Sequence, residues 1–85
     1  MPRVSFTGHL RRYLPVAAVD VPGDTVAVAL DAVFANEPRL RGYVLDDQGE
    51  IRKHVALFVN GERATLRDGV TSRDEIYVLQ ALSGG

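Results

Sequence analysis

The sequence predicts an α+β fold, a roll in which one main helix packs on one face of a mixed sheet. Apolar and polar residues alternate from Arg3 to Thr7, the period-two pattern of a half-buried strand. Between residues 26 and 34, apolar residues recur at helical spacing. Residues 76–82 are apolar on both sides, which is typical of a central strand. Strands at both ends of the chain and a helix between them favour a single helix-covered sheet.

Length and composition indicate one small domain. The chain has 85 residues, a net charge of −1 and no cysteine. This charge argues against nucleic acid or an anionic membrane as the main partner, because both select a cationic excess. The lack of cysteine excludes disulfides and thiolate metal sites. No apolar stretch reaches the roughly 18 residues of a membrane span, and no signal-peptide core is present. We expect a soluble, cytoplasmic protein, a single domain over residues 1–85.

The first half of the chain predicts a loose hairpin and then the helix. Val4 and Phe6 mark the first strand, a second short strand runs over about residues 16–21, and Pro22-Gly23 closes the pair. Asp24 or Thr25 is placed to cap the helix. Its apolar stripe comprises Val26, Ala29, Leu30, Val33 and Phe34. Asn36 and Pro38 end it, because proline disfavours helical geometry in the residue before it.

The second half predicts mainly strands. Tyr43-Val44-Leu45 is interpreted as a short strand, Asp46 to Glu50 as a polar turn and Ile51 as the start of the return. Residues 53–60 form a stronger strand, and Asn60-Gly61 is a strong hairpin signal because both residues tolerate positive φ. Residues 62–74 are polar, with anchors at Leu66 and Val70 and a turn at Asp68-Gly69.

The last strand runs directly into Gly84-Gly85. Glycine has no Cβ, so such a tail can thread where other residues would clash. We expect residues 83–85 to form a flexible tail that carries a reactive carboxylate. A central position for the preceding strand would anchor the exit of this tail.

Together these segments resemble the MoaD/ThiS family of ubiquitin-like sulfur carriers. The resemblance rests on Gly23-Asp24-Thr25, on Phe58-Val59-Asn60-Gly61-Glu62, on Asp74-Glu75-Ile76 and on Leu82-Ser83-Gly84-Gly85. It implies a β-grasp (ubiquitin-like) fold. It also implies that Gly85 is adenylated by an ATP-using enzyme similar to ubiquitin-activating enzymes, and is then converted to a thiocarboxylate that donates sulfur to a synthase.

Two departures from the family pattern leave the pathway open. Thr71-Ser72-Arg73-Asp74-Glu75 replaces the common Gly-Asp-Glu turn, and Gln80-Ala81 stands where many members have proline before the tail. The family's acceptors include cysteine, molybdopterin and thiamine precursors and specialised metabolites. Residues 45–52, followed by residues 58–62, look most similar to carriers that feed cysteine synthesis.

The chain itself has no motif for activating a carboxylate. It lacks a glycine-rich phosphate loop followed by lysine, so the catalyst and its ATP must belong to another protein. We therefore expect a non-enzyme that binds no cofactor. His9 and His54, 45 positions apart, are interpreted as surface residues, and Asp46 to Glu50 lacks the ligand spacing of a calcium loop. We expect no catalytic residue and no metal site.

A docking face is predicted on the last two long strands. If Val55, Leu57, Val59, Ile76 and Val78 point inward, Phe58, Tyr77 and Leu79 point outward as one apolar patch. Contiguous exposed apolar surface commonly marks a partner site. Leu82, near the tail, could insert into the partner.

Two other functions remain open. A protein modifier would transfer the same activated Gly85 to a lysine of another protein, giving heavier conjugates in cell extract. A plain interaction domain would keep an idle tail, and deleting Gly84-Gly85 would then have no effect. Mutation at Phe58 or Leu79 would still weaken partner binding.

Overall fold

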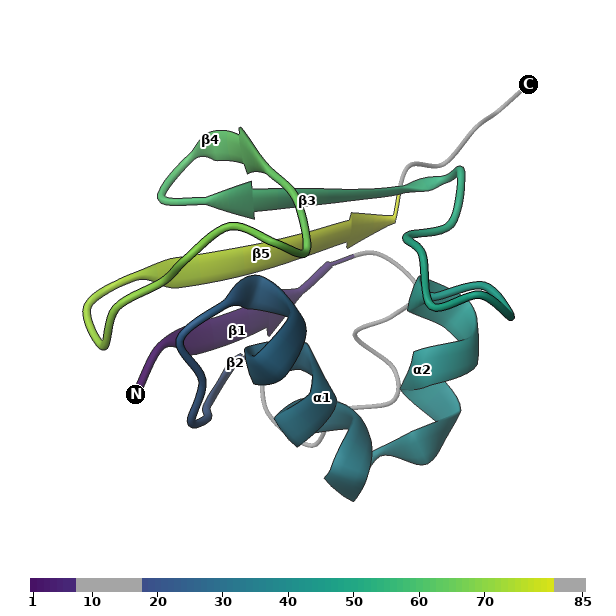
Figure 1. Cartoon of the computed structure of the whole chain (residues 1–85), viewed down its shortest axis with the longest axis horizontal. Helices are drawn as coiled ribbons and strands as arrows, with labels where there is room; N and C mark the ends of the chain where they lie inside the picture. Colours follow the sequence, from purple (N-terminus) through teal and green to yellow (C-terminus); the bar gives the residue numbers. More distant parts are fainter. Residues whose placement is uncertain (8–17, 81–85) are drawn as a thin grey trace.

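The computed structural model describes residues 1–7 and 18–80. Over these residues the chain forms a five-stranded mixed sheet and two helices, and the helices lie together on one face of the sheet (Figure 1). The strands are β1 (Arg3–Phe6), β2 (Ala18–Asp20), β3 (Val55–Val59), β4 (Glu62–Ala64) and β5 (Glu75–Gln80). The predicted α+β class is confirmed.

The sheet order β2-β1-β5-β3-β4 places the last strand in the centre, as predicted. β5 pairs with β1 in parallel and with β3 antiparallel, while β2 and β4 form the antiparallel edges. The first strand is confirmed, with Val4 and Phe6 buried. Residues 16 and 17 of the predicted second strand lie outside the described residues.

Helix α1 (Val26–Asn36) begins where the sequence predicts. Of the two candidates, Thr25 is the N-cap, and its Oγ1 accepts a hydrogen bond from the Val28 amide at 3.2 Å. The whole predicted stripe is buried: Val26, Ala29, Leu30, Val33 and Phe34. The stripe therefore faces the sheet, and its burial is the main source of the helix's stability.

The turn before α1 requires glycine. Gly23 has a φ of 151°, and a Cβ at this position would lie 2.7 Å from the Ala29 amide nitrogen. Both the backbone angle and the close approach exclude a larger residue. Gly23 thus lets the chain pass directly against the first turns of α1.

A second, shorter helix, α2 (Pro38–Val44), corrects the prediction of a strand at Tyr43-Val44-Leu45. Pro38 ends α1 but also begins α2, because a proline in the first turn lacks only an N–H that would be unpaired there. Leu40 and Val44, four residues apart, anchor α2 in the core. Two apolar anchors and a central Gly42 are too weak a pattern to predict this short helix.

The segment after α2 returns toward the sheet as predicted. Leu45 and Ile51 form an isolated antiparallel bridge around the polar turn. The Asp46 carboxylate closes this turn by accepting hydrogen bonds from the Gln48 amide at 2.8 Å and the Glu50 amide at 3.0 Å. The amide bonds lower the pKa of Asp46, because they stabilise its charged form.

The β3–β4 hairpin turns at Asn60-Gly61, where φ is 52° and 86°, as the sequence predicts. The sequence pattern does not predict β4, because residues 62–64 look like the start of a polar connection. Val70 is buried and Leu66 packs against the core, so both predicted anchors are confirmed.

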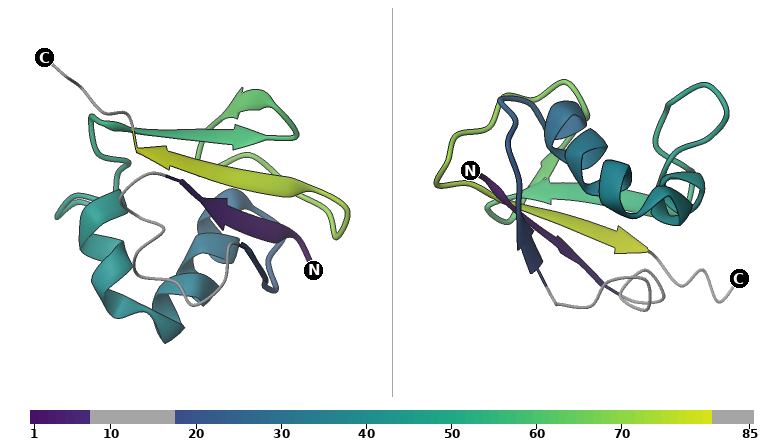
Figure 2. Two further views of the ribbon diagram at one scale, coloured as in Figure 1. Left: turned by 180° about the vertical axis from the view of Figure 1, so that it is seen from behind. Right: turned by 90° about the horizontal axis from the view of Figure 1, so that it is seen from below.

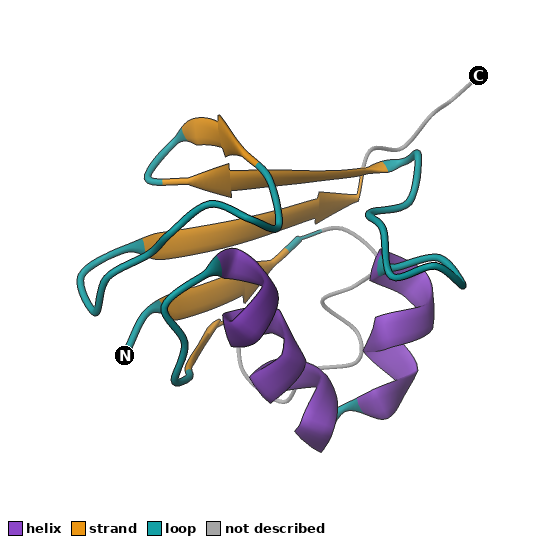
Figure 3. Cartoon of the chain, viewed as in Figure 1, coloured by secondary structure: helices purple, strands orange, loops and turns teal. Residues whose placement is uncertain are grey.

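The helices cover one face of the sheet (Figures 2 and 3). The buried side chains between the two layers form one apolar core. Its fully buried large side chains come from β1, β3, β5 and both helices: Leu30, Leu40, Leu57, Ile76, Val4, Val26, Val44 and Val78. Within the described ranges, neither helix is long and apolar enough to cross a membrane.

Candidate docking face

The sheet face that the helices leave uncovered holds the predicted apolar patch. Along β5, Ile76 and Val78 are buried toward the helices, whereas Tyr77 and Leu79 are only half-buried. Because side chains alternate along a strand, Tyr77 and Leu79 lie on the opposite face. The predicted orientation is therefore confirmed for β5.

The strand register brings these side chains together with those of β3. Phe58 lies directly opposite Tyr77, and Ala56 lies opposite Leu79. Facing residues on paired strands have Cβ atoms about 5 Å apart, close enough for contact. We call Ala56, Phe58, Tyr77 and Leu79 the open-face patch.

The row through Phe58 and Tyr77 continues across the sheet. Ser5 of β1 pairs with Tyr77, and Arg63 of β4 pairs with Phe58. The Arg63 guanidinium lies over the Phe58 ring, with its carbon 5.8 Å from the ring centroid. Arg63 was absent from the sequence-based site, although the Asn60-Gly61 turn already sets a register that pairs positions 58 and 63.

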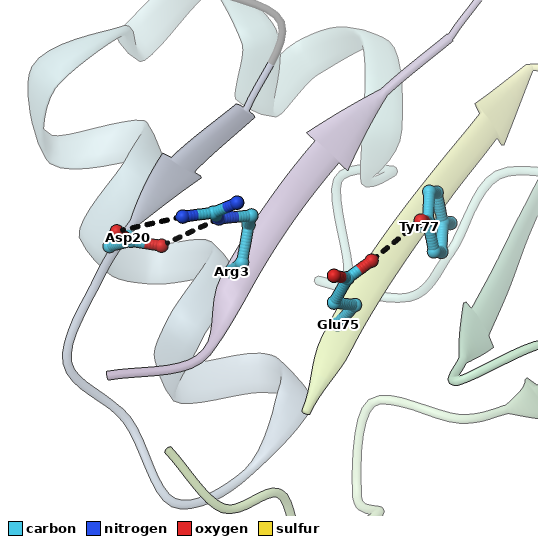
Figure 4. A network of polar contacts seen from close by, with 4 residues as sticks. All are labelled: Arg3, Asp20, Glu75 and Tyr77. Carbon is cyan, nitrogen blue, oxygen red and sulfur yellow. Dashed lines mark hydrogen bonds and ion pairs between the residues drawn. The ribbon is translucent and has the colours of Figure 1, made fainter. Parts of the chain in front are cut away.

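Two polar contacts lie on the same sheet face, one between Arg3 and Asp20 and one between Tyr77 and Glu75 (Figure 4). Arg3 Nε donates to Asp20 Oδ1 at 3.0 Å across β1 and β2, and this hydrogen bond lowers the pKa of Asp20. The Tyr77 hydroxyl donates to Glu75 Oε2 at 2.6 Å. That bond and the Glu75 charge raise the pKa of Tyr77, because both oppose formation of the phenolate.

A polar clamp fixes the start of β5 against β3. Asn60 Nδ2 donates to Asp74 Oδ1 at 2.8 Å, and Asn60 Oδ1 accepts from the Glu75 amide at 3.0 Å. The Thr71 amide donates to Asp74 Oδ2 at 2.8 Å. The Thr71 amide bond, followed by the Asn60 bond, lowers the pKa of Asp74. The clamp secures the register on which the open-face patch depends.

The other end of β5 leads to the predicted tail. Gln80, the last described residue, pairs with Val55. Its Oε1 is buried and has no hydrogen-bond partner in the described part of the chain. The predictions for Leu82, Ser83, Gly84 and Gly85 lie outside the described residues.

No cluster of three or more metal-ligating side chains occurs in residues 1–7 and 18–80. His54 is exposed on the connection before β3, while His9 lies outside the described residues.

The chain is similar to known proteins both in sequence and in structure. No protein-family model matches the chain. Small archaeal modifier protein 1 of Haloferax volcanii is 41% identical over 68 residues, covering 79% of this chain and 78% of that protein. The crystal structure of SAMP1 from Haloferax volcanii superposes with a TM-score of 0.84 at 33% identity, covering 99% of this chain and 98% of that chain. A chain of the Amycolatopsis orientalis BexX/CysO complex superposes with a TM-score of 0.88 at 22% identity over 100% of both chains.

Proposed function

The chain belongs to the MoaD/ThiS-type family of ubiquitin-like proteins, and from this premise we propose that it is a sulfur carrier that reacts through Gly85. A partner enzyme transfers AMP from ATP to the Gly85 carboxylate and releases pyrophosphate. A sulfide equivalent then displaces AMP, which leaves a thiocarboxylate for a sulfur-accepting synthase. The chain supplies the carboxyl group and the docking surface, and the partner supplies the nucleotide site.

Membership of the MoaD/ThiS-type family carries this proposal. The sheet topology adds physical support. β5 is held by β1 as far as Val78 and by β3 as far as Gln80. A residue that must reach a partner's active site benefits from a rigid base, because less ordering is left for the binding step.

We further propose that the activating enzyme docks on the open-face patch and that Leu82 adds a contact beside the tail. The patch joins aromatic and aliphatic side chains on two central strands, the type of surface that dominates partner binding. Activation of this kind requires cytoplasmic ATP, so we assign the protein to the cytoplasm. We also propose that the chain has no catalytic role of its own.

Intact mass spectrometry tests the proposal. The full chain is incubated with an adenylyltransferase from the same genome, ATP and a sulfide source. We expect its mass to rise by the difference between sulfur and oxygen. A chain lacking Gly84 and Gly85 is the control and stays unchanged. If no such enzyme ever alters the full chain, the proposal is wrong.

A role as a protein modifier is the second candidate, favoured by the name of the relative that is 41% identical. Activated Gly85 would then form an amide with a lysine of another protein. Cell extract would contain a ladder of conjugates that disappears when Gly85 is deleted. Because both roles begin with the same adenylate, thiocarboxylate formation and conjugation are measured separately.

A further inference from the structure

Arg63 borders the open-face patch from the edge strand β4. Its side chain is exposed, and it crosses from β4 onto the ring of Phe58, its cross-strand neighbour. A guanidinium at this distance from an aromatic face is attracted by the ring's negative π-surface. The ring therefore gives the flexible arginine a preferred position at the margin of the patch.

Arg63 differs from the other charged residues on this face. Arg3 and Asp20 form an ion pair, and Glu75 accepts the hydroxyl of Tyr77. The structure records no ion pair between Arg63 and a carboxylate of the described residues. Within residues 1–7 and 18–80, no carboxylate neutralises its positive charge.

When a guanidinium lies against an aromatic ring, its N–H donors point outward in the plane of the guanidinium and stay free to bind another group. This planar set of donors matches the two oxygens of a carboxylate. Prior positioning by Phe58 reduces the side-chain entropy that is lost when a partner binds. The same carboxylate-bearing partner would also place apolar surface on Phe58, so one contact would combine charge and shape.

We propose that Arg63 is the specificity-determining residue of the open face and that it binds a carboxylate of the activating enzyme. The proposal rests on the sulfur-carrier function above and names the chemistry of its docking step. The occupant is an Asp or Glu side chain adjacent to an apolar residue that covers Phe58. An enzyme that has a neutral or basic residue in place of this Asp or Glu leaves Arg63 unpaired, and it therefore binds the chain more weakly.

Steady-state kinetics of ATP–pyrophosphate exchange by the activating enzyme test this role. For Arg63→Gln we expect the KM for the chain to rise about 10-fold with kcat unchanged, since the contact serves binding rather than chemistry. Arg63→Glu raises KM further, and Arg63→Lys gives an intermediate value because lysine keeps the charge but lacks the planar donors.

Arg67→Gln is the matched control. Arg67 is also exposed, but it has no ring contact with the patch. We expect its KM to stay within about 2-fold of the unmodified chain. High salt reduces the difference in KM between Arg63→Gln and the unmodified chain, because salt screens an exposed ionic contact.

Phe58→Leu shows whether the ring positions Arg63. Phe58→Leu keeps apolar surface and removes the aromatic face. If Phe58 and Arg63 act as one unit, the rise in KM of the double variant Phe58→Leu/Arg63→Gln is smaller than the two single effects combined. Additive effects would overturn the role of the ring.

Equal KM values for Arg63→Gln, Arg67→Gln and the unmodified chain would overturn the inference while leaving the sulfur-carrier function intact. No exchange with the unmodified chain would overturn both. Thermal unfolding of each variant confirms that the kinetic changes come from folded protein.

Discussion

The two faces of the sheet differ in how deeply they bury their side chains. The face toward α1 and α2 holds Leu57, Ile76 and Val78, which are at most 2% exposed. The opposite face holds Phe58 and Tyr77, which stay half-buried and form polar or ring contacts at their margins. Under the docking role proposed for the open face, neighbouring positions on one strand serve folding and recognition separately. We expect substitutions on the covered face to change the free energy of unfolding, and those on the open face to change partner affinity.

Leu57 and Phe58 offer the sharpest test of this separation, because they are adjacent in β3. Leu57→Ala empties part of the core and should lower the free energy of unfolding by about 3 kcal/mol. Phe58→Ala removes cross-strand contacts only, and should lower it by about 1 kcal/mol or less. Urea unfolding measures both values. Similar losses for the two variants would contradict the assigned division between the faces.

Gly23 and Gly42 test the packing of the helices on the covered face. Gly23→Ala forces a Cβ against the Ala29 backbone and should destabilise the fold by about 2 kcal/mol. Gly42→Ala has open space in α2 and should stabilise it by up to about 1 kcal/mol. The melting temperatures of the two variants test these opposite effects. A Gly23→Ala protein as stable as the unmodified chain would contradict the close approach of Gly23 to Ala29.

The polar clamp connects the two faces, because it fixes β5 beside β3. Asn60→Gly keeps the positive φ but removes both side-chain hydrogen bonds, and should lower the free energy of unfolding by about 1 kcal/mol. Chemical unfolding at neutral pH gives this value. Phe58→Ala is the reference, since it leaves the clamp intact.

The clamp also predicts a dependence on acid. The pKa of Asp74 is lowered in the fold, so its contribution is fully present above the unfolded pKa of about 3.9 and is lost as the pH falls through the folded pKa. Asn60→Gly removes one cause of this shift. The variant should therefore lose less additional stability than the unmodified chain between pH 6 and the acid range (about pH 3). An equal loss of stability in both proteins would show that Asn60 does not lower the pKa of Asp74.

The smallest expected effect is at Gln80. Its buried Oε1 lacks a partner among the described residues, and Gln80→Met replaces it with an apolar group of similar length. We expect a gain of about 0.5 kcal/mol in the free energy of unfolding. A loss of stability in thermal unfolding would show that the oxygen is satisfied.

Much of the covered face could be predicted from the sequence because its signals are local and periodic. The stripe of α1 and the alternation of β3 and β5 each repeat an apolar residue toward one core. The signals for α2 and β4 are weaker. α2 has two buried anchors, and β4 is a three-residue strand whose only buried side chain is Ala64. Such short elements form because neighbouring elements hold them, which no local pattern records.

The open face shows the same limit. Phe58 and Tyr77 could be placed because β3 and β5 alternate regularly and pair with each other. Arg63 was missed because its importance depends on a contact across the hairpin, and its own segment looks like a polar connection. The Asn60-Gly61 turn contained the necessary register, so applying it to both sides of the turn would have found the residue.

Photocrosslinking to the activating enzyme tests the central claim most directly. p-Benzoylphenylalanine replaces either Phe58 on the open face or Tyr43 on α2, an aromatic residue that is 45% exposed on the helical side. We expect a strong crosslink to the enzyme from position 58 and little from position 43. A crosslink from position 43 with none from position 58 would contradict it, because the helical side would then be the docking surface.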